Sequence, residues 1–233
     1  MLIFALDSTA IVGSVALCRD GKPIASFTVK NGNTHSETLL PMAKALFDVT
    51  GVTPDDVDIF ACSEGPGSFT GVRIGAATIK GLTFGKNKTV IGVSALEAMA
   101  RNLLPANGII CPVMNARRGQ VYNALFRAEG TTLTRLTEDR ALSALELKNE
   151  LETMGLPFAL VGDGVEVVTA VLGDLTPCPV SAQIAEQNAL GVAATALELY
   201  KNGVRGTDAE LAPTYLRLPQ AERERLEKEQ RKV

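Results

Sequence analysis

The sequence predicts an α/β protein built as two lobes that share one order of secondary structure. Two observations carry the prediction. Three strands precede alternating helices and strands at the start of the chain, and the same order begins again after residue 108. The chain of 233 residues is 46% hydrophobic, which is enough for one large domain or for two lobes of about 100–120 residues each.

The first series fills the chain up to residue 103. Apolar runs predict strands at 2–7, 12–19 and 24–30, with Asp20 and Gly21 as the hairpin turn between the last two. Hydrophobic periodicity then predicts helices and strands in alternation: a helix at 35–50, a strand at 57–63, a helix at 71–85, a strand at 89–93 and a short helix at 94–103.

The second series repeats this order without an obvious sequence repeat. Its predicted elements are strands at 109–115, 120–128 and 132–136, a helix at 143–154, a strand at 158–162, a helical segment after Gly164 and a helix at 184–202. Two such series are typical of a duplicated ribonuclease-H-like architecture, in which the lobes face each other across a cleft.

The predicted boundaries divide the chain into three parts. We expect an N-terminal lobe at 1–104 that carries partner-binding helices, and a C-terminal lobe at 105–211. The remaining residues, 212–233, form a closing segment and a charged C-terminal helix that we expect to return to the N-terminal lobe.

Composition bears on partners and compartment. A net charge of −3 and the lack of Trp argue against a stand-alone nucleic-acid binder, which usually has a strongly basic face. The four cysteines stand singly in apolar runs, as buried thiols of a reducing compartment do. The first residues form a strand instead of a signal peptide, and no apolar run approaches a membrane span. We therefore expect a cytoplasmic protein without a membrane segment.

The most informative stretch is residues 65–75, with four glycines and a proline. It joins a predicted buried strand to a helix N-terminus, the position where an α/β protein usually binds a ligand. Glycines there indicate unusual backbone angles or close approach of another surface. The pattern leaves open whether that surface belongs to a phosphate or to a protein.

A weak nucleotide cleft is predicted between the lobes. A carboxylate in the first strand-to-strand turn could position a metal-bound water, cationic groups in the matching second turn could face phosphate, and a Gly-x-Gly could admit an adenosine. The residues concerned are Asp7, Ser8, Thr9, Arg117, Gly162 and Gly164. The first turn lacks a glycine and the second lacks a carboxylate, so we interpret the cleft as vestigial. An ordinary polar turn is the alternative for residues 7–9.

The single histidine, His35, stands at a predicted helix start, where Thr34 and Glu37 could form a capping box. Neither a two-histidine metal site nor a Ser-His-Asp triad can be assembled around it, so we expect a structural or contact role. We predict no catalytic residue and no metal site. Pro41 inside this helix predicts a kink or a later start.

The helices that flank the glycine-rich stretch carry more apolar surface than one core requires. Apolar residues of 35–50 spread over roughly 220°, where packing on one core needs little more than about 100°. The helix at 71–85 has small or apolar residues on three faces, and Arg73 and Lys80 are its charges. Both helices could lie in the protein's own core. We favour a pair that shows a shared apolar surface to a partner.

Four stretches together resemble the TsaB family of bacterial tRNA threonylcarbamoyladenosine biosynthesis proteins, also known as YeaZ-type and formerly grouped with "glycoproteases" of the M22 type. They are residues 5–9, 35–41, 65–75 and 213–217. The resemblance implies a fold of the actin-like ATPase superfamily. It also implies a role, with the paralogue TsaD and the ATPase TsaE, in attaching threonylcarbamoyl to the adenosine beside the anticodon of tRNAs that read ANN codons.

The paralogue TsaD binds its metal through a pattern of the form G-V-N-H-x-x-G-H. In the corresponding stretch here, residues 92–99, Ala95 and Met99 occupy the ligand positions and cannot bind such a cation. The resemblance therefore implies no metal and no intrinsic cofactor. The cleft and the TsaD interface are the two places left open for ATP or ADP.

We expect a noncatalytic scaffold that binds and activates TsaD, recruits TsaE, meets tRNA only as part of the complex and forms a homodimer when isolated. The interface would be built from the helices at 37–49 and 71–84. Its predicted residues are His35, Glu37, Leu40, Pro41, Lys44, Phe47, Phe69, Thr70, Val72, Arg73, Ala76, Ile79 and Lys80. The alternative is a stand-alone enzyme, either a metal-dependent peptidase or an ATP-hydrolysing or kinase-like protein.

Overall fold

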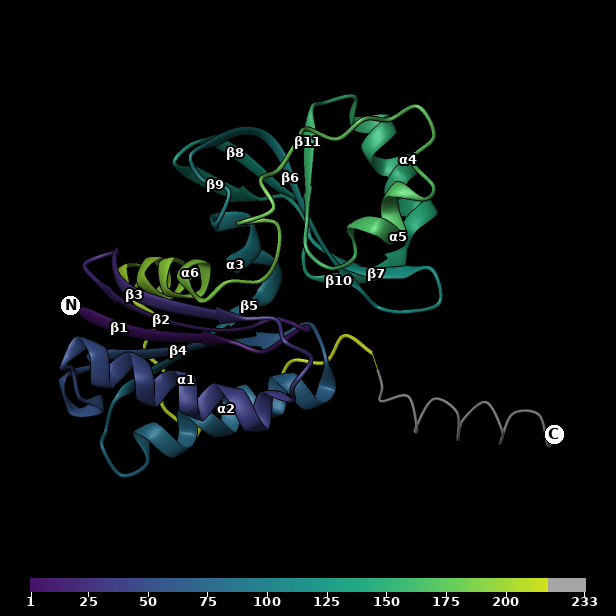
Figure 1. Ribbon diagram of the computed structural model, residues 1–233. Coiled ribbons are helices and arrows are strands. Elements are labelled where there is room, and N and C mark those ends of the chain that lie inside the picture. The colour runs from purple at the N-terminus through teal and green to yellow at the C-terminus, as the bar shows by residue number, and fades with distance from the viewer. Residues whose placement is uncertain (218–233) are drawn as a thin grey trace, which may run out of the picture.

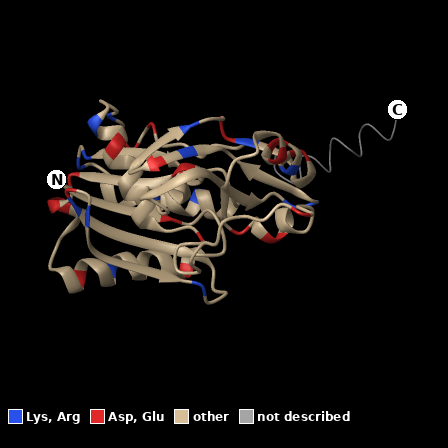
Figure 2. Cartoon of the chain, turned by 90° about the horizontal axis from the view of Figure 1, so that it is seen from above, with Lys and Arg blue, Asp and Glu red and all other residues tan. Residues whose placement is uncertain are grey.

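The computed structural model describes residues 1–217, which form two β-sheets with helices packed against them (Figure 1). The predicted charged C-terminal helix lies outside these residues. Among the described helices, none has the length and apolar character needed to cross a membrane. Basic and acidic residues are interspersed over the described chain (Figure 2).

The first sheet has the strand order β3-β2-β1-β4-β5. Strands β1 to β3 are antiparallel, while β4 and β5 run parallel to β1. Asp20 and Gly21 both have positive φ, as a tight hairpin between β2 and β3 requires, so that predicted turn is confirmed. The strands are β1 (Leu2–Asp7), β2 (Gly13–Arg19), β3 (Lys22–Val29), β4 (Ile59–Gly65) and β5 (Thr89–Ser94).

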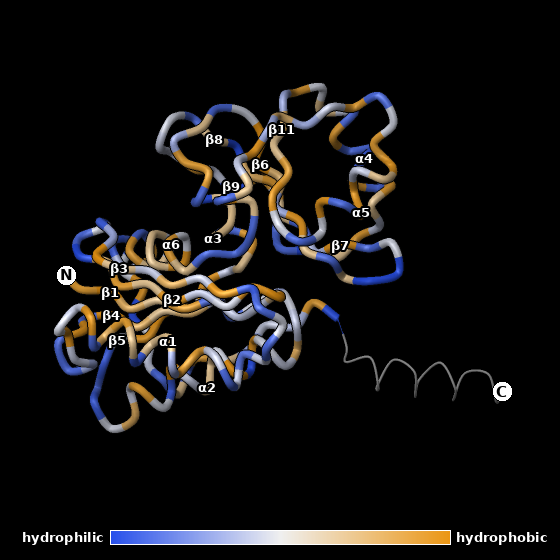
Figure 3. The backbone as a smooth tube through the Cα atoms, in the orientation of Figure 1, coloured by the Kyte–Doolittle hydropathy of each residue, from blue (hydrophilic) through white to orange (hydrophobic). Residues whose placement is uncertain are grey.

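Strand β1 is buried on both faces, and its alternate residues enter two different cores. Phe4 and Leu6 join the cluster under α1 (His35–Thr50) and α2 (Phe69–Thr83). Ile3 and Ala5 join the cluster under α6 (Ala189–Lys201) on the opposite face. Figure 3 shows hydrophobic residues gathered along these strands and hydrophilic residues at many of the connections. The first sheet is therefore the middle layer of three (Figure 1).

The second sheet repeats the order of the first. Strand β6 pairs antiparallel with β7 and β8, which lie end to end along one side of it, and β9 and β10 form the next row. On its other side β6 pairs with β11, and a parallel bridge from Ala159 to Cys178 marks a fifth position. The strands are β6 (Ala106–Asn115), β7 (Gln120–Asn123), β8 (Phe126–Gly130), β9 (Thr132–Arg135), β10 (Arg140–Ser143) and β11 (Phe158–Val161).

The predicted two-lobed, duplicated ribonuclease-H-like fold is thus confirmed. The remaining elements are short: η1 (Pro54–Asp56), α3 (Ala95–Arg101), α4 (Ala144–Met154) and α5 (Val165–Thr169). The exact lobe boundaries stay a prediction, with one difference in packing. Helix α6 falls inside the range expected for the C-terminal lobe, yet it packs against the first sheet.

Several elements differ in extent from the expected ones. Helix α1 has the predicted bounds, so Pro41 does not delay its start, whereas α2 begins two residues before the predicted position. Helix α6 starts only at Ala189, because the side chain of Asn188 caps it by accepting from the Leu190 N–H at 2.8 Å. The strand expected at 120–128 is divided into β7 and β8, and β10 was not expected.

Candidate functional site

A cavity of about 540 Å³ lies between the two lobes. The first lobe contributes the turn after β1 and the loop that leads into α2, and the second contributes the end of β6 and the turn into β7. The lining residues are Thr9, Ala10, Ile11, Gly67, Ser68, Phe69, Thr70, Met114, Asn115, Ala116, Arg117, Tyr122 and Asp163. Of the predicted cleft residues, Thr9 and Arg117 line this cavity, whereas the other four do not.

The carboxylate of Asp7 is buried within the first lobe. It accepts hydrogen bonds from the Thr9 backbone N–H at 2.9 Å, the Thr9 hydroxyl at 2.8 Å and the Ser63 hydroxyl. Burial raises the pKa of Asp7 above its ordinary value, against the opposing effects of these bonds and of His35. The oxygens that could have positioned a water are therefore engaged by donors of the chain itself.

The glycine-rich stretch is required by contacts inside the chain. A Cβ on Gly67 would lie 2.4 Å from the Thr9 carbonyl oxygen, and one on Gly71 would lie 2.0 Å from that of Ser8. A Cβ on Gly75 would come within 2.6 Å of the Ser8 hydroxyl, which itself donates to the Gly71 carbonyl at 2.9 Å. The start of α2 thus presses against the turn that would hold phosphate in a working nucleotide site.

The Gly162–Gly164 turn has a similar explanation. A Cβ on Gly162 would lie 2.2 Å from the Val113 carbonyl oxygen, and one on Gly164 would lie 2.9 Å from the carbonyl carbon of Met114. Both glycines therefore allow this turn to lie against β6. Asp163 between them lines the cavity, and its burial raises the pKa of its carboxyl.

The β6–β7 turn forms the second-lobe rim of the cavity in an unusual conformation. Arg117, Arg118 and Gly119 have positive φ in succession, at 64°, 54° and 70°. Left-handed conformations are costly for arginine, and they persist only where surrounding bonds fix them. Here the Asn115 side chain accepts from the Arg117 N–H at 2.8 Å.

The closing segment contacts Phe69 and Ala116, which line this cavity from the two lobes. The sequence predicted its return to the N-terminal lobe but not its contact with the second lobe. The Thr214 N–H donates to the Glu64 carbonyl at 2.7 Å, and the Tyr215 ring stacks on Phe69 with centroids 4.5 Å apart. The Arg217 guanidinium donates to the Ala116 carbonyl at 2.8 Å. The described part of the closing segment therefore returns to the N-terminal lobe and then contacts the second. An aromatic residue followed by arginine near the chain end was the available signal.

Helices α1 and α2 lie side by side on the outer face of the first sheet (Figure 1). Four residues predicted for a partner interface are buried in the core beneath them: Phe47, Val72, Ala76 and Ile79. That part of the prediction is wrong, because these side chains face the protein's own sheet. The other predicted residues are exposed or half-buried: His35, Glu37, Leu40, Pro41, Lys44, Phe69, Thr70, Arg73 and Lys80.

His35 joins α1 to the turn after β1. Its Nε2–H donates to the Ala10 carbonyl at 2.6 Å. The Glu37 carboxylate accepts from the Thr34 backbone N–H at 3.0 Å, which is the bond that the acidic residue of a capping box makes. It also accepts from the Thr34 hydroxyl at 2.8 Å. The sequence predicted a structural or contact role for His35, and its hydrogen bond to Ala10 is a structural one. Its contact with a partner stays a prediction.

The two positions that the family resemblance matches to metal ligands are apolar and buried. Ala95 and Met99 of α3 pack in the cluster beneath the second lobe. Within residues 1–217, no three His, Cys, Asp or Glu side chains are grouped as a metal site would need. Cys18, Cys62 and Cys111 are buried as expected, whereas Cys178 is exposed, contrary to the prediction.

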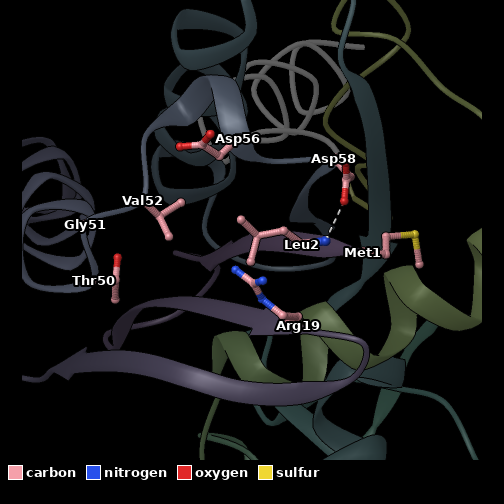
Figure 4. Close-up of a pocket in the computed structure, with 8 residues that line it drawn as sticks. All are labelled: Met1, Leu2, Arg19, Thr50, Gly51, Val52, Asp56 and Asp58. Carbon is pink, nitrogen blue, oxygen red and sulfur yellow. Dashed lines mark hydrogen bonds between the residues drawn. The ribbon is translucent and has the colours of Figure 1, made fainter.

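A second cavity, of about 480 Å³, lies at the opposite end of β1 from Asp7 (Figure 4). It is lined by Met1, Leu2, Arg19, Thr50, Gly51, Val52, Asp56 and Asp58. The Asp58 carboxylate accepts from the Leu2 N–H at 2.7 Å. None of the predicted site residues lines this cavity.

The sequence of this chain is similar to a protein family and to individual known proteins over most of its length. Residues 30–223 match the profile of the family described as "TsaD: tRNA N6-adenosine threonylcarbamoyltransferase". A Bacillus subtilis protein named "tRNA threonylcarbamoyladenosine biosynthesis protein TsaB" is 28% identical over 229 residues, which cover 95% of this chain and 96% of that one. The Escherichia coli protein of the same name is 33% identical over 167 residues, which cover 70% and 72%.

Two solved structures also superpose on this chain. The structure titled "YeaZ from Pseudomonas aeruginosa" superposes with a TM-score of 0.80 at 25% identity, covering 92% of this chain and 99% of that one. The ethanolamine utilization protein EutJ from Carboxydothermus hydrogenoformans superposes with a TM-score of 0.51 at 15% identity, covering 83% and 89%. The second likeness extends to the fold alone. The resemblance carried by the four sequence stretches is confirmed.

Proposed function

Since the chain belongs to the TsaB family of tRNA threonylcarbamoyladenosine biosynthesis proteins, we propose that it is a noncatalytic scaffold that binds and activates a TsaD-type transferase and recruits TsaE. In this role it would meet tRNA only within the complex. When isolated, it would use the same surface to form a homodimer.

The observation that carries the proposal is the outer face of α1 and α2. Leu40 is 57% exposed and stands beside exposed Pro41. On α2, Ala77 and Gly81 are exposed, and a Cβ on Gly81 would meet no atom within 4 Å. Small residues on a helix allow a second helix to approach closely, and an exposed leucine gives it apolar area to bury. A helical pair of a related subunit fits this surface.

The burial of four predicted residues narrows the proposed interface. Charged residues flank its apolar residues along each helix. On α1, Glu37 and Lys44 stand three and four positions from Leu40. On α2, Arg73 and Lys80 stand four and three positions from Ala77. This arrangement, apolar at the centre of contact and polar around it, is common in interfaces between separately folded proteins. The proposed contact residues are now His35, Glu37, Leu40, Pro41, Lys44, Phe69, Thr70, Arg73, Ala77, Lys80 and Gly81.

The cleft supports a noncatalytic role. Asp7 and Ser8, the residues that would act on a nucleotide, are bonded to Thr9, Ser63 and Gly71 of the same chain. Releasing them would require breaking these buried bonds. We therefore do not propose ATP hydrolysis or peptidase activity for this chain.

A matched pair of substitutions tests the interface. Leu40→Glu should weaken binding to the TsaD protein of the same organism at least about thirtyfold, because hot-spot residues contribute about 2 kcal/mol or more. Leu145→Glu is the control: Leu145 is also 57% exposed, but it lies on α4 of the second lobe. Isothermal titration with each variant measures both effects. If the two variants bind the TsaD protein with equal affinity, the proposed interface is refuted.

A further inference from the structure

The segment of residues 213–217, which we call the clasp, begins on the first lobe with a contact between backbones. The Thr214 N–H donates to the Glu64 carbonyl of β4 at 2.7 Å. A Cβ on Gly65 would lie 2.4 Å from the Thr214 carbonyl oxygen, so the clasp can approach β4 this closely only because residue 65 is glycine. This end of the clasp has little freedom to move.

The middle of the clasp holds the start of α2. The Tyr215 ring is nearly parallel to that of Phe69, with an interplanar angle of 16°. Arg73 Nε donates to the Tyr215 hydroxyl at 2.7 Å, and the guanidinium lies 5.5 Å from the Tyr215 ring centroid. Stacking, a hydrogen bond and a cation–π contact therefore meet on one side chain. Phe69 and Arg73 both belong to the proposed partner surface.

The far end of the clasp reaches the second lobe. Leu216 packs against the apolar cluster that contains Met114, Ala116 and Tyr122. The Arg217 guanidinium donates to the Ala116 carbonyl at 2.8 Å. Ala116 lines the cavity from the second lobe, and Phe69 lines it from the first. The clasp thus connects opposite walls of the same cavity along the outside of the molecule.

We propose that the clasp couples the separation of the two lobes to the state of the α2 surface. The clasp is anchored to β4 at Thr214, and Tyr215 lies between this anchor and Arg217. If the lobes move apart, either Arg217 is drawn away from Ala116 or Tyr215 is drawn away from Phe69. A partner that engages Phe69 and Arg73 therefore acts on the cavity, and a change in the cavity acts on partner binding by the same factor. The part that concerns the partner rests on the proposed function.

The lobe separation can be measured in the isolated chain. Spin labels on Asn149→Cys of α4 and Lys201→Cys of α6 report it in a Cys178→Ser background, because the other three cysteines are buried. We expect a single narrow distance distribution. Tyr215→Ala and Arg217→Ala should each shift and broaden it.

Thr214→Ala is the matched control, because its hydrogen bond to Glu64 uses the backbone and survives the change. Thermal unfolding verifies that each variant folds. Tyr215→Phe retains the stacked ring and should change the distribution less than Tyr215→Ala. If the distance distributions of Tyr215→Ala and Arg217→Ala match that of Thr214→Ala, the proposal that the clasp holds the lobes is refuted.

The second measurement is affinity for the TsaD-type partner. Arg217 bonds to the second lobe, yet its replacement by alanine should weaken binding at least about fivefold, the lower range of couplings between distant sites. Affinity equal to that of Thr214→Ala would refute the coupling. If the unmodified chain does not bind the partner at all, the proposed function fails, and the distance measurement alone then decides whether the clasp holds the lobes.

Discussion

Asp7 lies at the end of β1, where a nucleotide enzyme of this architecture would keep a reactive carboxylate, and here its hydrogen bonds hold a turn together. Removing an ionised carboxyl from water is costly, and the donors on Thr9 and Ser63 offset only part of that cost, since the pKa of Asp7 stays above its ordinary 3.8. A group whose folded-state pKa is raised binds a proton more tightly in the folded state. Its contribution to stability therefore declines as the pH rises from about 3.8 through the folded pKa.

Relative to the unmodified chain, the substitution Asp7→Asn should raise the free energy of unfolding by more at pH 8 than at pH 4. Asparagine can still accept from Thr9, but it carries no charge that must be buried. Asp7→Ala leaves the Thr9 and Ser63 donors without an acceptor and should be less stable than Asp7→Asn by about 1–3 kcal/mol. Urea unfolding at the two pH values measures both differences. The same pH dependence in Asp7→Asn as in the unmodified chain would contradict the assignment.

At the scale of single elements, the glycines of α2 fall into two kinds. Gly71 faces the backbone of Ser8, where a methyl group has no room, and Gly81 faces open space. The first kind allows the helix to dock on the turn after β1. The second lies on the face that we propose for a partner helix. One added methyl group should therefore change the stability of the protein in opposite directions at the two kinds of glycine.

Gly71→Ala should destabilise the protein by about 3 kcal/mol, the upper part of the usual range for overpacking. Gly81→Ala should stabilise the isolated chain by roughly 0.5–1 kcal/mol, because alanine is the better helix former. Chemical denaturation of both variants gives the comparison. A destabilised Gly81→Ala would show that this face is already covered within the isolated chain.

Periodicity and turn residues predicted most elements, because those signals are local. The hairpin at Asp20 and Gly21 and the capping box at Thr34 depend on neighbours in the sequence, and both were found. Strand β10 was missed, because its four residues are a strand only through pairing with β7. Periodicity showed that Val72, Ala76 and Ile79 share a face of α2, but only the tertiary packing decides that this face meets the sheet.

The candidate site was predictable only in part for the same reason. Of the six predicted cleft residues, Thr9 and Arg117 line the cavity, since the ends of strands in this architecture meet at one edge of the sheet. The partners of its side chains were not predictable: Asp7 meets Ser63 across 56 positions of sequence, and Arg73 meets Tyr215 across 142. No local pattern encodes contacts of that range.

At the scale of the whole molecule, the reactivity of the cysteines measures how well the core excludes solvent and reagents. Burial raises the pKa of Cys18 to about 11 and that of Cys111 to about 12, and Cys62 is also fully enclosed. At pH 8 one thiol per folded chain, that of Cys178, should react rapidly with a thiol reagent, and four should react in denaturant. The Cys178→Ser variant should lose the rapid phase. Any rapidly reacting thiol in that variant would mean that a core opens readily.

Helix α6 follows the whole second lobe in sequence and covers one face of the first sheet. During synthesis, a nascent chain that has left the ribosome only as far as residue 104 therefore displays Ile3, Ala5 and Ile91 on a bare surface. That surface is sealed only after about a hundred further residues have been translated, and at 5–20 residues per second this takes roughly 5–20 seconds. In that interval the nascent chain exposes an apolar sheet face to which chaperones can bind. In the complete protein this face is buried under α6.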